Sequence, residues 1–446
     1  MCVSPKRPLV SFIVRAHNLE KYLGKCLDSI LSQAFDDYEI VLINNHSRDG
    51  SERICRDYAA ASAKIRYYRL EGEHTGGDAI IAGVRQSSGE YIHLIDGDDE
   101  LAPKVYDKIA AVLQRERPDV LFGGFSSILD EKIVSFADTP FDPKHINGQT
   151  KDAALTYLSQ KQPFILATWR LIVSRRLSKL YARTLMSVVP IAYGAHFDVF
   201  ISIRILIAAR SIRYMENPLY RYRVRSASIS RASEADQVLD CMKFMINLDR
   251  YMGETAMTDS ERFFAYAYAK QYFFQLSAAL CTLTDEQVME VAIRIAEAFM
   301  PNSATSKLFS ASPVAASLIH AVLSKGDRAG IVSHRASCMA EVKRVARIIS
   351  AKQGRVYLAP TGNIGLYMKH AFSSVGVKIS GFFDNDRLKD GMLLADAPVR
   401  LPSFVKEIAE QITIVIASRY ANVRDEMYDQ FIELGIEKDH LLVFEF

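Results

Sequence analysis

Three aspartates, interrupted by one glycine, follow a short apolar run and are the residues of this chain best suited to chemistry. The segment reads Ile95-Asp96-Gly97-Asp98-Asp99. Asp96 and Asp98 stand two positions apart, so their carboxylates can present oxygens to the same small volume. Oxygen ligands suit Mn²⁺ or Mg²⁺, and a site with few carboxylates leaves coordination positions for a diphosphate. A cation held there would act as a Lewis acid on a departing phosphate group. The structural alternative is that the segment is a solvated acidic loop without a chemical role.

The segments around this cluster alternate between strand and helix patterns. Apolar, β-type runs cover 9–14, 38–43, 65–70 and 91–95, and helical patterns cover 20–33, about 51–62 and 78–86. This alternation predicts βαβ units and a mainly parallel sheet. Ligands of such sheets bind beyond the carboxyl ends of the strands. We therefore expect residues 15–18, 44–47 and 96–99 to lie on one rim of the sheet.

Several motifs resemble, in the correct order, those of the GT-A fold family 2 glycosyltransferases. That family typically reads V-S-V-I-I-P-x-Y-N, V-D-x-x-S-x-D-G-S and G-E-Y-I-x-F-x-D-x-D-D, and this chain reads SFIVRAHN, VLINNHSRDGS and GEYIHLIDGDD. Residues 168–172 are similar to the family's tryptophan segment, and 196–200 to its E-D-x-x-F motif. Residues 220–230 are similar to its Y-x-Y-R-x-x-x-x-S-I-S closing segment. The resemblance covers about half of the chain.

The resemblance implies an inverting, metal-dependent transfer of a sugar from a nucleoside-diphosphate sugar. Asp96 would contact the ribose or the metal, and Asp98 would bind the metal, Mn²⁺ or Mg²⁺. Asp198 would be the general base that takes the proton of the acceptor hydroxyl. An inverting displacement needs one such base on the acceptor side, opposite the leaving group. Asp198 precedes an apolar run, so a helix N-cap is the structural alternative for it.

The donor-binding motifs depart from the family pattern at three places. Asn44 stands where the family carries an aspartate beside the nucleobase, and Asn both donates and accepts hydrogen bonds, so uracil and cytosine are both open. Residues 79–81 lack the frequent A-R-N arginine, and Arg15 replaces the family's proline. Arg15 either supplies the lost positive charge or reflects drift at a tolerant rim. The predicted donor-binding residues are Arg15, Asn18, Asn44 and Asp96.

We expect an α/β protein with three regions. Residues 1–232 form the GT-A catalytic domain with its mainly parallel sheet, 233–350 a helical linker region, and 351–446 a small Rossmann-like α/β domain. Residues 356–365 resemble the strand-turn-helix of a dinucleotide site, with Pro360 in place of the first glycine and Asp384 at the spacing of a ribose-binding acid. No residues for hydride transfer are visible. A structural or assembly role is therefore favoured over dinucleotide binding.

Composition and cysteine spacing limit the class of protein and its cellular compartment. The formal charge of +3 over 446 residues disfavours a nucleic-acid binder, and six scattered cysteines without a C-x-x-C pair argue against a zinc site or a disulfide framework. These features predict a cytoplasmic protein. The sequence contains no run of about 18 consecutive apolar residues, the length that would predict a membrane span. Peripheral contact with the inner face of the cell membrane stays open, because several basic side chains could bind lipid phosphates. They are Arg204, Arg210, Arg213, Arg221, Arg223, Arg225 and Arg231.

Three functions remain open from the sequence. The first is a hexosyl- or N-acetylhexosaminyl-type glycosyltransferase, whose family resemblance implies a glycan or lipid-linked acceptor of bacterial surface polysaccharides such as lipopolysaccharide or capsule. The second is a CDP-dependent phospho-polyol-type transferase, for which Asn44 is the support. The third is an inactive scaffold in a glycan-assembly complex. A nucleotide-sugar dehydrogenase acting through residues 351–446 is more remote. Aromatic stripes in the helical region suit a core or a homo-oligomer interface.

Overall fold

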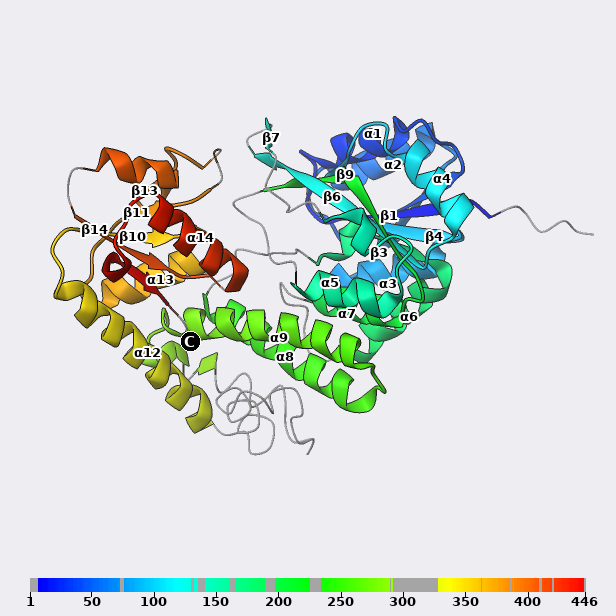
Figure 1. Cartoon of the computed structure of the whole chain (residues 1–446). Helices are drawn as coiled ribbons and strands as arrows, with labels where there is room; N and C mark the ends of the chain where they lie inside the picture. The colour runs from blue at the N-terminus through cyan, green and yellow to red at the C-terminus, as the bar shows by residue number, and fades with distance from the viewer. Residues whose placement is uncertain are drawn as a thin grey trace, which may run out of the picture. The chain divides into compact units, whose positions relative to one another are not determined.

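The chain separates into two compact units in a computed structural model, Met1–Ile229 and Ser230–Phe446 (Figure 1). The predicted division at residues 232 and 350 is finer than this and stays a prediction. The structure describes residues 7–72, 76–129, 132–134, 141–160, 166–188, 197–224, 234–288, 290–291, 328–361, 363–385, 387, 389–408, 411–418 and 421–444.

The first unit begins with the parallel sheet that the sequence predicts. Four strands pair in the order β3-β2-β1-β4, and every pairing among them is parallel. The side chains of β1, β2 and β4 are mostly buried on both faces, because helices cover both sides of a parallel sheet, whereas those of the edge strand β3 are mostly half-buried. The bounds are β1 (Val10–Ala16), β2 (Tyr38–Asn45), β3 (Ile65–Leu70) and β4 (Tyr91–Asp96).

The same sheet continues beyond β4 with mixed pairing. β8 (Leu171–Ser174) is antiparallel to β4 and to β6 (Val120–Leu129), whereas β9 (Ile212–Arg223) runs parallel to β6. Two short strands complete the part that the structure describes. β5 (Glu100–Leu101) pairs with β9, and β7 (Lys132–Val134) pairs with β6. β5 follows the aspartate segment directly, so its pairing with β9 brings β9 close to the aspartates.

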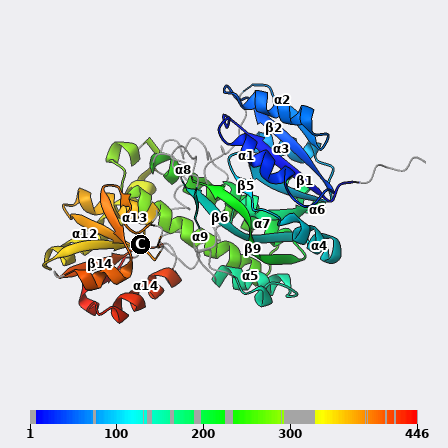
Figure 2. The same cartoon turned by 90° about the horizontal axis from the view of Figure 1, so that it is seen from above.

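Helices lie on both faces of this sheet (Figures 1 and 2). One layer contains α1 (Leu23–Leu31), α2 (Ser51–Ala61) and α4 (Tyr106–Glu116), and the other contains α3 (Gly76–Gln86), α6 (Arg175–Val188) and α7 (Phe197–Ala208). α1 shows the pattern that drives this packing, since its buried residues recur at 23, 26, 27 and 30. α5 (Lys151–Gln160) and the 3₁₀ turns η1 (Pro143–His145) and η2 (Thr168–Arg170) connect the remaining strands.

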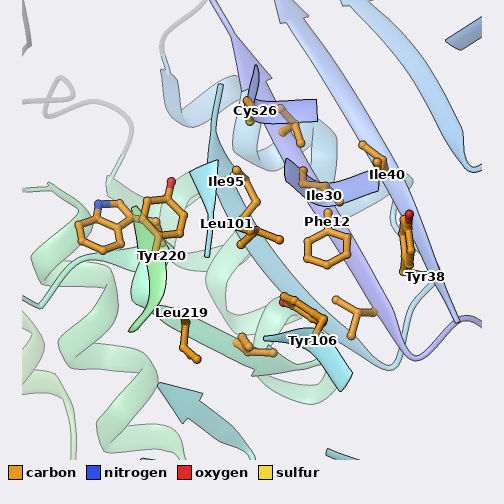
Figure 3. Close-up of a cluster of buried hydrophobic side chains, with 14 of the residues drawn as sticks. Phe12, Cys26, Ile30, Tyr38, Ile40, Ile95, Leu101, Tyr106, Leu219 and Tyr220 are labelled. Atoms are coloured by element: carbon orange, nitrogen blue, oxygen red, sulfur yellow. The ribbon is translucent and has the colours of Figure 1, made fainter. Parts of the chain in front are cut away.

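Aromatic and aliphatic side chains from β1, α1 and α4 fill the space between the sheet and its first helical layer (Figure 3). Phe12 is fully buried, and its ring lies 4.6 Å from that of Tyr106 and 5.4 Å from that of Tyr38, both edge-on. Edge-on aromatic contacts add directional packing to the burial of apolar surface. This core therefore fixes β1, whose last residues reach the predicted site.

The second unit begins with the helices that the sequence predicts for this region. They are α8 (Glu234–Glu254), α9 (Asp259–Leu280) and α12 (Arg328–Ser350). The sequence also predicts breaks between helices near residues 300 and 325, which lie outside the described residues. α9 starts at a capping box: the Thr258 hydroxyl accepts from the backbone N–H of Glu261, whose carboxylate accepts from Thr258 N–H. None of the described helices is both long and apolar enough to cross a bilayer.

A small sheet completes the second unit, with the order β12-β13-β11-β10-β14-β15 and parallel pairing except between β12 and β13. The sequence also predicts a helix over 403–410, and this prediction is wrong, because 402–407 form a short 3₁₀ segment, η5, which begins at Pro402 and buries Val405 against the sheet. The bounds are β10 (Arg355–Ala359), α13 (Asn363–Ser374), β11 (Ile379–Phe383), β12 (Leu393–Leu394), β13 (Ala397–Arg400), η5 (Pro402–Glu407), β14 (Ile412–Ile416), α14 (Ala421–Glu433), η6 (Lys438–His440) and β15 (Leu441–Val443).

Candidate active site

The parallel pairing brings the predicted rim together. β1 pairs with β2 and β4 so that Arg15 lies opposite Asp96, and Ala16 lies opposite Asn44. The side chain of Arg15 is 37% exposed and that of Asp96 is 21% exposed, and Arg15 Nε donates to Asp96 Oδ1 at 2.5 Å. An ion pair this exposed adds little stability. Its consequence is positional, since it holds a cation and a carboxylate together at the open edge of the sheet.

The aspartate segment forms a tight turn directly after β4. Asp99 N–H donates to the carbonyl of Asp96 at 2.9 Å, and Gly97 N–H donates to the carbonyl of Arg15 at 3.0 Å. A Cβ on Gly97 would lie 2.6 Å from that same carbonyl oxygen. Only glycine therefore lets the turn come this close to β1. Asp98, the predicted metal ligand, is half-buried at the top of the turn.

Asp99 is the centre of a buried hydrogen-bond network that the sequence analysis did not identify. Its Oδ2 accepts from the Tyr220 hydroxyl at 2.9 Å, and its Oδ1 accepts from Arg223 N–H at 2.7 Å. The Tyr220 oxygen also accepts from Asp96 N–H at 3.0 Å. Burial, followed by the charges of Asp98 and Asp96, raises the pKa of Asp99 well above its usual range. Asp99 thus acts as a positioning residue that anchors the turn to β9.

Arg223 secures the other side of the turn. Its Nε donates to the carbonyl of Asp98 at 2.9 Å, and its Nη2 pairs with Glu100 at 2.6 Å. The Arg223 side chain is only 4% exposed, and its guanidinium lies 5.0 Å from the centre of the Tyr22 ring. The third aspartate of the D-x-D-D pattern and the Y-x-Y-R closing segment were the available signals for this network. Their contact joins residues more than 120 positions apart.

We expect Tyr220→Phe to weaken this network without leaving a large cavity. The variant removes the hydroxyl that serves both Asp99 and the backbone of Asp96, so two buried polar groups lose a partner, at a cost of about 1–3 kcal/mol of unfolding free energy. Chemical denaturation would measure the loss. Tyr91→Phe is the matched control, because no hydrogen bond of the Tyr91 hydroxyl occurs among the described residues. Equal stability of the two variants would contradict the proposed role of Tyr220.

An aromatic stack packs against β9 at Tyr220 and Tyr222. Trp169 stacks on Tyr220 with ring centres 4.6 Å apart and on Tyr222 at 5.5 Å. Trp169 is 7% exposed, so the tryptophan segment contributes to the core at this point. His93 holds η2 in place, since its Nε2 lies 2.9 Å from the carbonyl of Trp169 and its Nδ1 lies 2.6 Å from the Tyr106 hydroxyl. Burial lowers the pKa of His93 to about 4, so the ring stays neutral.

The loops after β1 and β2 are joined by side chains that bind backbone groups. Asn18 adopts a φ of 54°, its N–H donates to the Ser47 hydroxyl at 3.1 Å, and its Oδ1 accepts from Arg48 N–H at 2.8 Å. Asn tolerates this left-handed conformation better than most residues. Asn18, predicted to bind the donor, therefore lies at the rim and also connects the two loops. Its contact with a donor stays a prediction.

Asn44 is fully buried, and both ends of its amide already have protein partners. Its Oδ1 accepts from Ser47 N–H at 3.1 Å, and its Nδ2 donates to the Tyr67 hydroxyl at 3.3 Å. An aspartate could accept both from Ser47 N–H and from the Tyr67 hydroxyl, so these contacts suit either side chain. The departure from the family pattern therefore has no structural explanation here. Direct recognition of a base by Asn44 stays a prediction.

His46 is a further rim residue that the sequence analysis did not single out. It adopts a φ of 51°, and its Nδ1 is buried with no hydrogen-bond partner among the described residues. Positive φ at a non-glycine residue is costly and is often found at binding sites. The conformation could not have been predicted from the D-x-x-S pattern, in which this position is variable.

Asp198 lies in the first turn of α7, half-buried, and its Oδ1 accepts from Val199 N–H at 2.8 Å. Burial raises the pKa of Asp198 to about 7, while Val199 N–H and the charge of Arg15 act to lower it and the charge of Asp96 acts to raise it. The charges of Arg15 and Asp96 both act on the Asp198 carboxyl group, so the three side chains lie within electrostatic range of one another. A carboxyl group with a pKa near neutrality is suited to proton transfer. His196 lies outside the described residues.

Comparison with known proteins identifies the family of the N-terminal region. Residues 11–170 match the family model described as "Glycosyl transferase family 2".

This chain contains a family 2 glycosyltransferase domain.

The relatives of the glycosyltransferase are bacterial. It is 25% identical over 253 residues to glycosyltransferase GlyA of Streptococcus pneumoniae serotype 4, a match covering 55% of this chain and 35% of GlyA. It is 27% identical over 236 residues to glycosyltransferase GlyG of the same organism, covering 50% and 73%. The match to GlyA thus spans about a third of that protein. The crystal structure of Staphylococcus aureus TarS 1–349 in complex with UDP-GlcNAc shares the fold, with a TM-score of 0.50 and 16% identity over 75% of this chain and 92% of that one.

The two candidate carboxylates suit a divalent ion that completes its coordination with substrate oxygens. No group of three or more His, Cys, Asp or Glu side chains is arranged as a metal site in the described part of the chain. Asp98 and Asp96 supply two carboxylates, and Mg²⁺ in such sites is commonly held by one or two carboxylates together with substrate phosphates and water. Asp96 Oδ1 is also paired with Arg15, and metal binding by Asp98 and Asp96 stays a prediction.

Arg213 and Arg223, two of the arginines that could meet lipid phosphates, are already paired within the described part of the chain. Arg213 forms an ion pair with Glu116 and Arg223 with Glu100, whereas Arg221 lies 3.9 Å from Glu100. Arg225 and Arg231 lie outside the described residues. Peripheral membrane contact therefore stays a prediction.

The second unit carries the strand-turn-helix predicted for a dinucleotide site, but its acid is engaged within the protein. Asp384 is 7% exposed, accepts from Thr361 N–H at 3.1 Å and pairs with Lys389 at 2.9 Å. A Cβ on Gly365 would lie 2.8 Å from the carbonyl oxygen of Pro360, so this glycine allows α13 to pack closely against the end of β10. These contacts support the structural role favoured for this region, and dinucleotide binding stays a prediction.

Proposed function

We propose that the N-terminal unit is an inverting, metal-dependent glycosyltransferase that moves a sugar from a nucleoside-diphosphate sugar to a glycan or lipid-linked acceptor. The observation that carries this proposal is the pairing of Arg15 with Asp96 at the rim where β1 and β4 end, within the electrostatic range of Asp198. The likeness to TarS in complex with UDP-GlcNAc supports a nucleotide-sugar donor. The bacterial relatives support an acceptor of the bacterial surface-polysaccharide class.

In this proposal the residues of the chain act on both sides of the anomeric carbon. Asp198 accepts the proton of the acceptor hydroxyl while that oxygen bonds to the anomeric carbon and the bond to the diphosphate breaks. Arg15 places a positive charge beside the departing diphosphate, and Asp96 contacts the ribose. A divalent ion held by Asp98 would supply Lewis-acid stabilisation of the leaving group. Asp99, Tyr220 and Arg223 keep the turn rigid, so little reorganisation is needed during the reaction.

The two alternatives receive different support. The CDP-dependent transferase rested on Asn44, whose amide is engaged within the protein by Ser47 and Tyr67. The inactive scaffold rested on the departures from the family pattern. Two features favour activity over the scaffold: Arg15 is paired with Asp96, and burial gives Asp198 a pKa of about 7. Glycosyl transfer therefore remains the proposal that the geometry supports best.

A nucleotide panel tests the proposal. Thermal unfolding would be followed with UDP, CDP, GDP, TDP and NAD, each with and without Mn²⁺, for the wild type and for Asp98→Ala. A diphosphate at a hundred times its Kd stabilises the folded state by about 2.7 kcal/mol, which gives a visible rise in Tm. We expect a Mn²⁺-dependent rise with one diphosphate that is lost in the variant. No response to any diphosphate would favour the scaffold. A response to NAD alone would indicate a dinucleotide site in the second unit.

A further inference from the structure

A groove with a volume of about 390 Å³ lies in the first unit, immediately after the aspartate turn. It runs between the start of α4 and the end of β9. Three of its lining residues are cations, Lys104, Lys108 and Arg221, and no acidic side chain is among its described lining residues. Ser126 adds a hydroxyl, and Met215 and Leu219 make the wall on the β9 side apolar. A concave surface with this charge attracts anions.

Both lysines occupy positions that their local backbone does not favour. Lys104 has a φ of 52°, a left-handed conformation better suited to glycine or asparagine. Lys108 stands in the first turn of α4, where the positive end of the helix dipole disfavours a cation. Neither lysine forms an ion pair among the described residues. Both lysine side chains are exposed at the groove, so a ligand of opposite charge bound there could contact them.

Glu100 connects this groove to the aspartate turn. It pairs with Arg223 at 2.6 Å, and Arg223 in turn donates to the carbonyl of Asp98. Its distance to Arg221 is longer, 3.9 Å. Glu100 thus binds the arginine of the turn more closely and leaves most of the charge of Arg221 to the groove.

We propose that this groove binds a phosphate group carried by the acceptor, so that the substrate of the glycosyltransferase is an anionic, phosphate-bearing acceptor. The proposal rests on the function proposed above, since the groove begins three residues after Asp99. The lysines and Arg221 contact the phosphate, and Met215 and Leu219 contact the apolar part of the acceptor next to it. The phosphate belongs either to a lipid headgroup or to a soluble phosphate ester of the glycan.

Calorimetry with inorganic tripolyphosphate in metal-free buffer tests the groove. The test variant is Lys104→Asn with Lys108→Gln, in which asparagine tolerates the left-handed backbone. The control is Lys343→Gln with Lys378→Gln, which removes the same charge from exposed lysines of the second unit. We expect affinity to fall roughly tenfold for each groove lysine removed and to stay unchanged in the control. Equal affinities of the two variants would overturn the proposal.

Vesicle co-sedimentation identifies the source of the phosphate. Binding to equimolar phosphatidylcholine and phosphatidylglycerol vesicles, absent with pure phosphatidylcholine and lost in the groove variant, supports a lipid headgroup. Tripolyphosphate binding that depends on the lysines, without vesicle binding, supports a soluble phosphate ester. The nucleotide panel on the wild type is read separately. A missing nucleotide response refutes the transferase proposal, and lysine-independent tripolyphosphate binding refutes the groove.

Discussion

Replacing Asp198 with asparagine is expected to lower kcat by about a thousandfold, within the range that general bases contribute to catalysis. Asparagine keeps the shape of the side chain but cannot accept a proton. The Mn²⁺-dependent rise in Tm with the donor nucleotide should persist, because Asp198 belongs to the acceptor side of the proposed mechanism. The measurement is the release of nucleoside diphosphate from the donor selected by the nucleotide panel, with water or a glycan as acceptor.

The pH dependence gives this prediction a second readout. Burial raises the pKa of Asp198 to about 7, so the carboxyl group is protonated below that pH and cannot act as a base. The logarithm of kcat/KM should therefore rise with pH and level off above an apparent pKa near 7. Asp198→Glu, the control, retains a carboxylate and should keep this acid limb at a lower rate. An acid limb that persists unchanged in Asp198→Asn would assign the proton transfer to another group.

Gly97→Ala is expected to cost about 3 kcal/mol of unfolding free energy, a typical magnitude for forcing an atom into a well-packed site. The new Cβ would lie 2.6 Å from the backbone oxygen of Arg15, 3.0 Å from Leu19 Cδ1 and 3.3 Å from Leu23 Cδ1. β1 cannot move away, because it is hydrogen-bonded to β2 and β4 along its whole length. The aspartate turn must shift instead, and with it Asp96 and Asp98.

Thermal unfolding measures both consequences of this substitution. For a unit of this size the stability loss corresponds to a fall in Tm of about 6–12 °C. The displaced turn should also abolish the Mn²⁺-dependent response to the donor nucleotide. Gly253→Ala in α8 is the matched control, since no atom lies within 4 Å of its added Cβ, and alanine should gain about 0.5–1 kcal/mol there. An unchanged Tm for Gly97→Ala would refute the close approach of the turn to β1.

The strands and the rim were predictable because their determinants are local. Apolar runs of strand length fix β1, β2 and β4, and the parallel order that follows places Arg15, Asn44 and Asp96 at one edge. The partners of Asp99 were not predictable in this way. Tyr220 and Arg223 lie more than 120 residues away, and they reach Asp99 only because β5 pairs with β9 in antiparallel register.

The environment of Asn44 shows the same limit at shorter range. Its partner Tyr67 lies on the neighbouring strand β3, in a register that no local pattern specifies. The sequence therefore identified Asn44 as a departure from its family. Its contact with Tyr67 could be found only from the pairing of β2 with β3. The positive φ of His46 is a further case, because it depends on how the loop closes over β2.

The pairing of β5 with β9 also determines when the site can form during synthesis. The strands β1, β2 and β4 leave the ribosome early, and contacts among them are available once residue 96 has emerged. The aspartate turn receives its anchors Tyr220 and Arg223 only after about 120 further residues have been made. Contacts between distant residues form slowly because a long loop must close first. A nascent chain that ends before β9 therefore contains the four parallel strands but leaves Asp99 without Tyr220 and Arg223, so the aspartate turn takes its final form only with the last described strand of the unit.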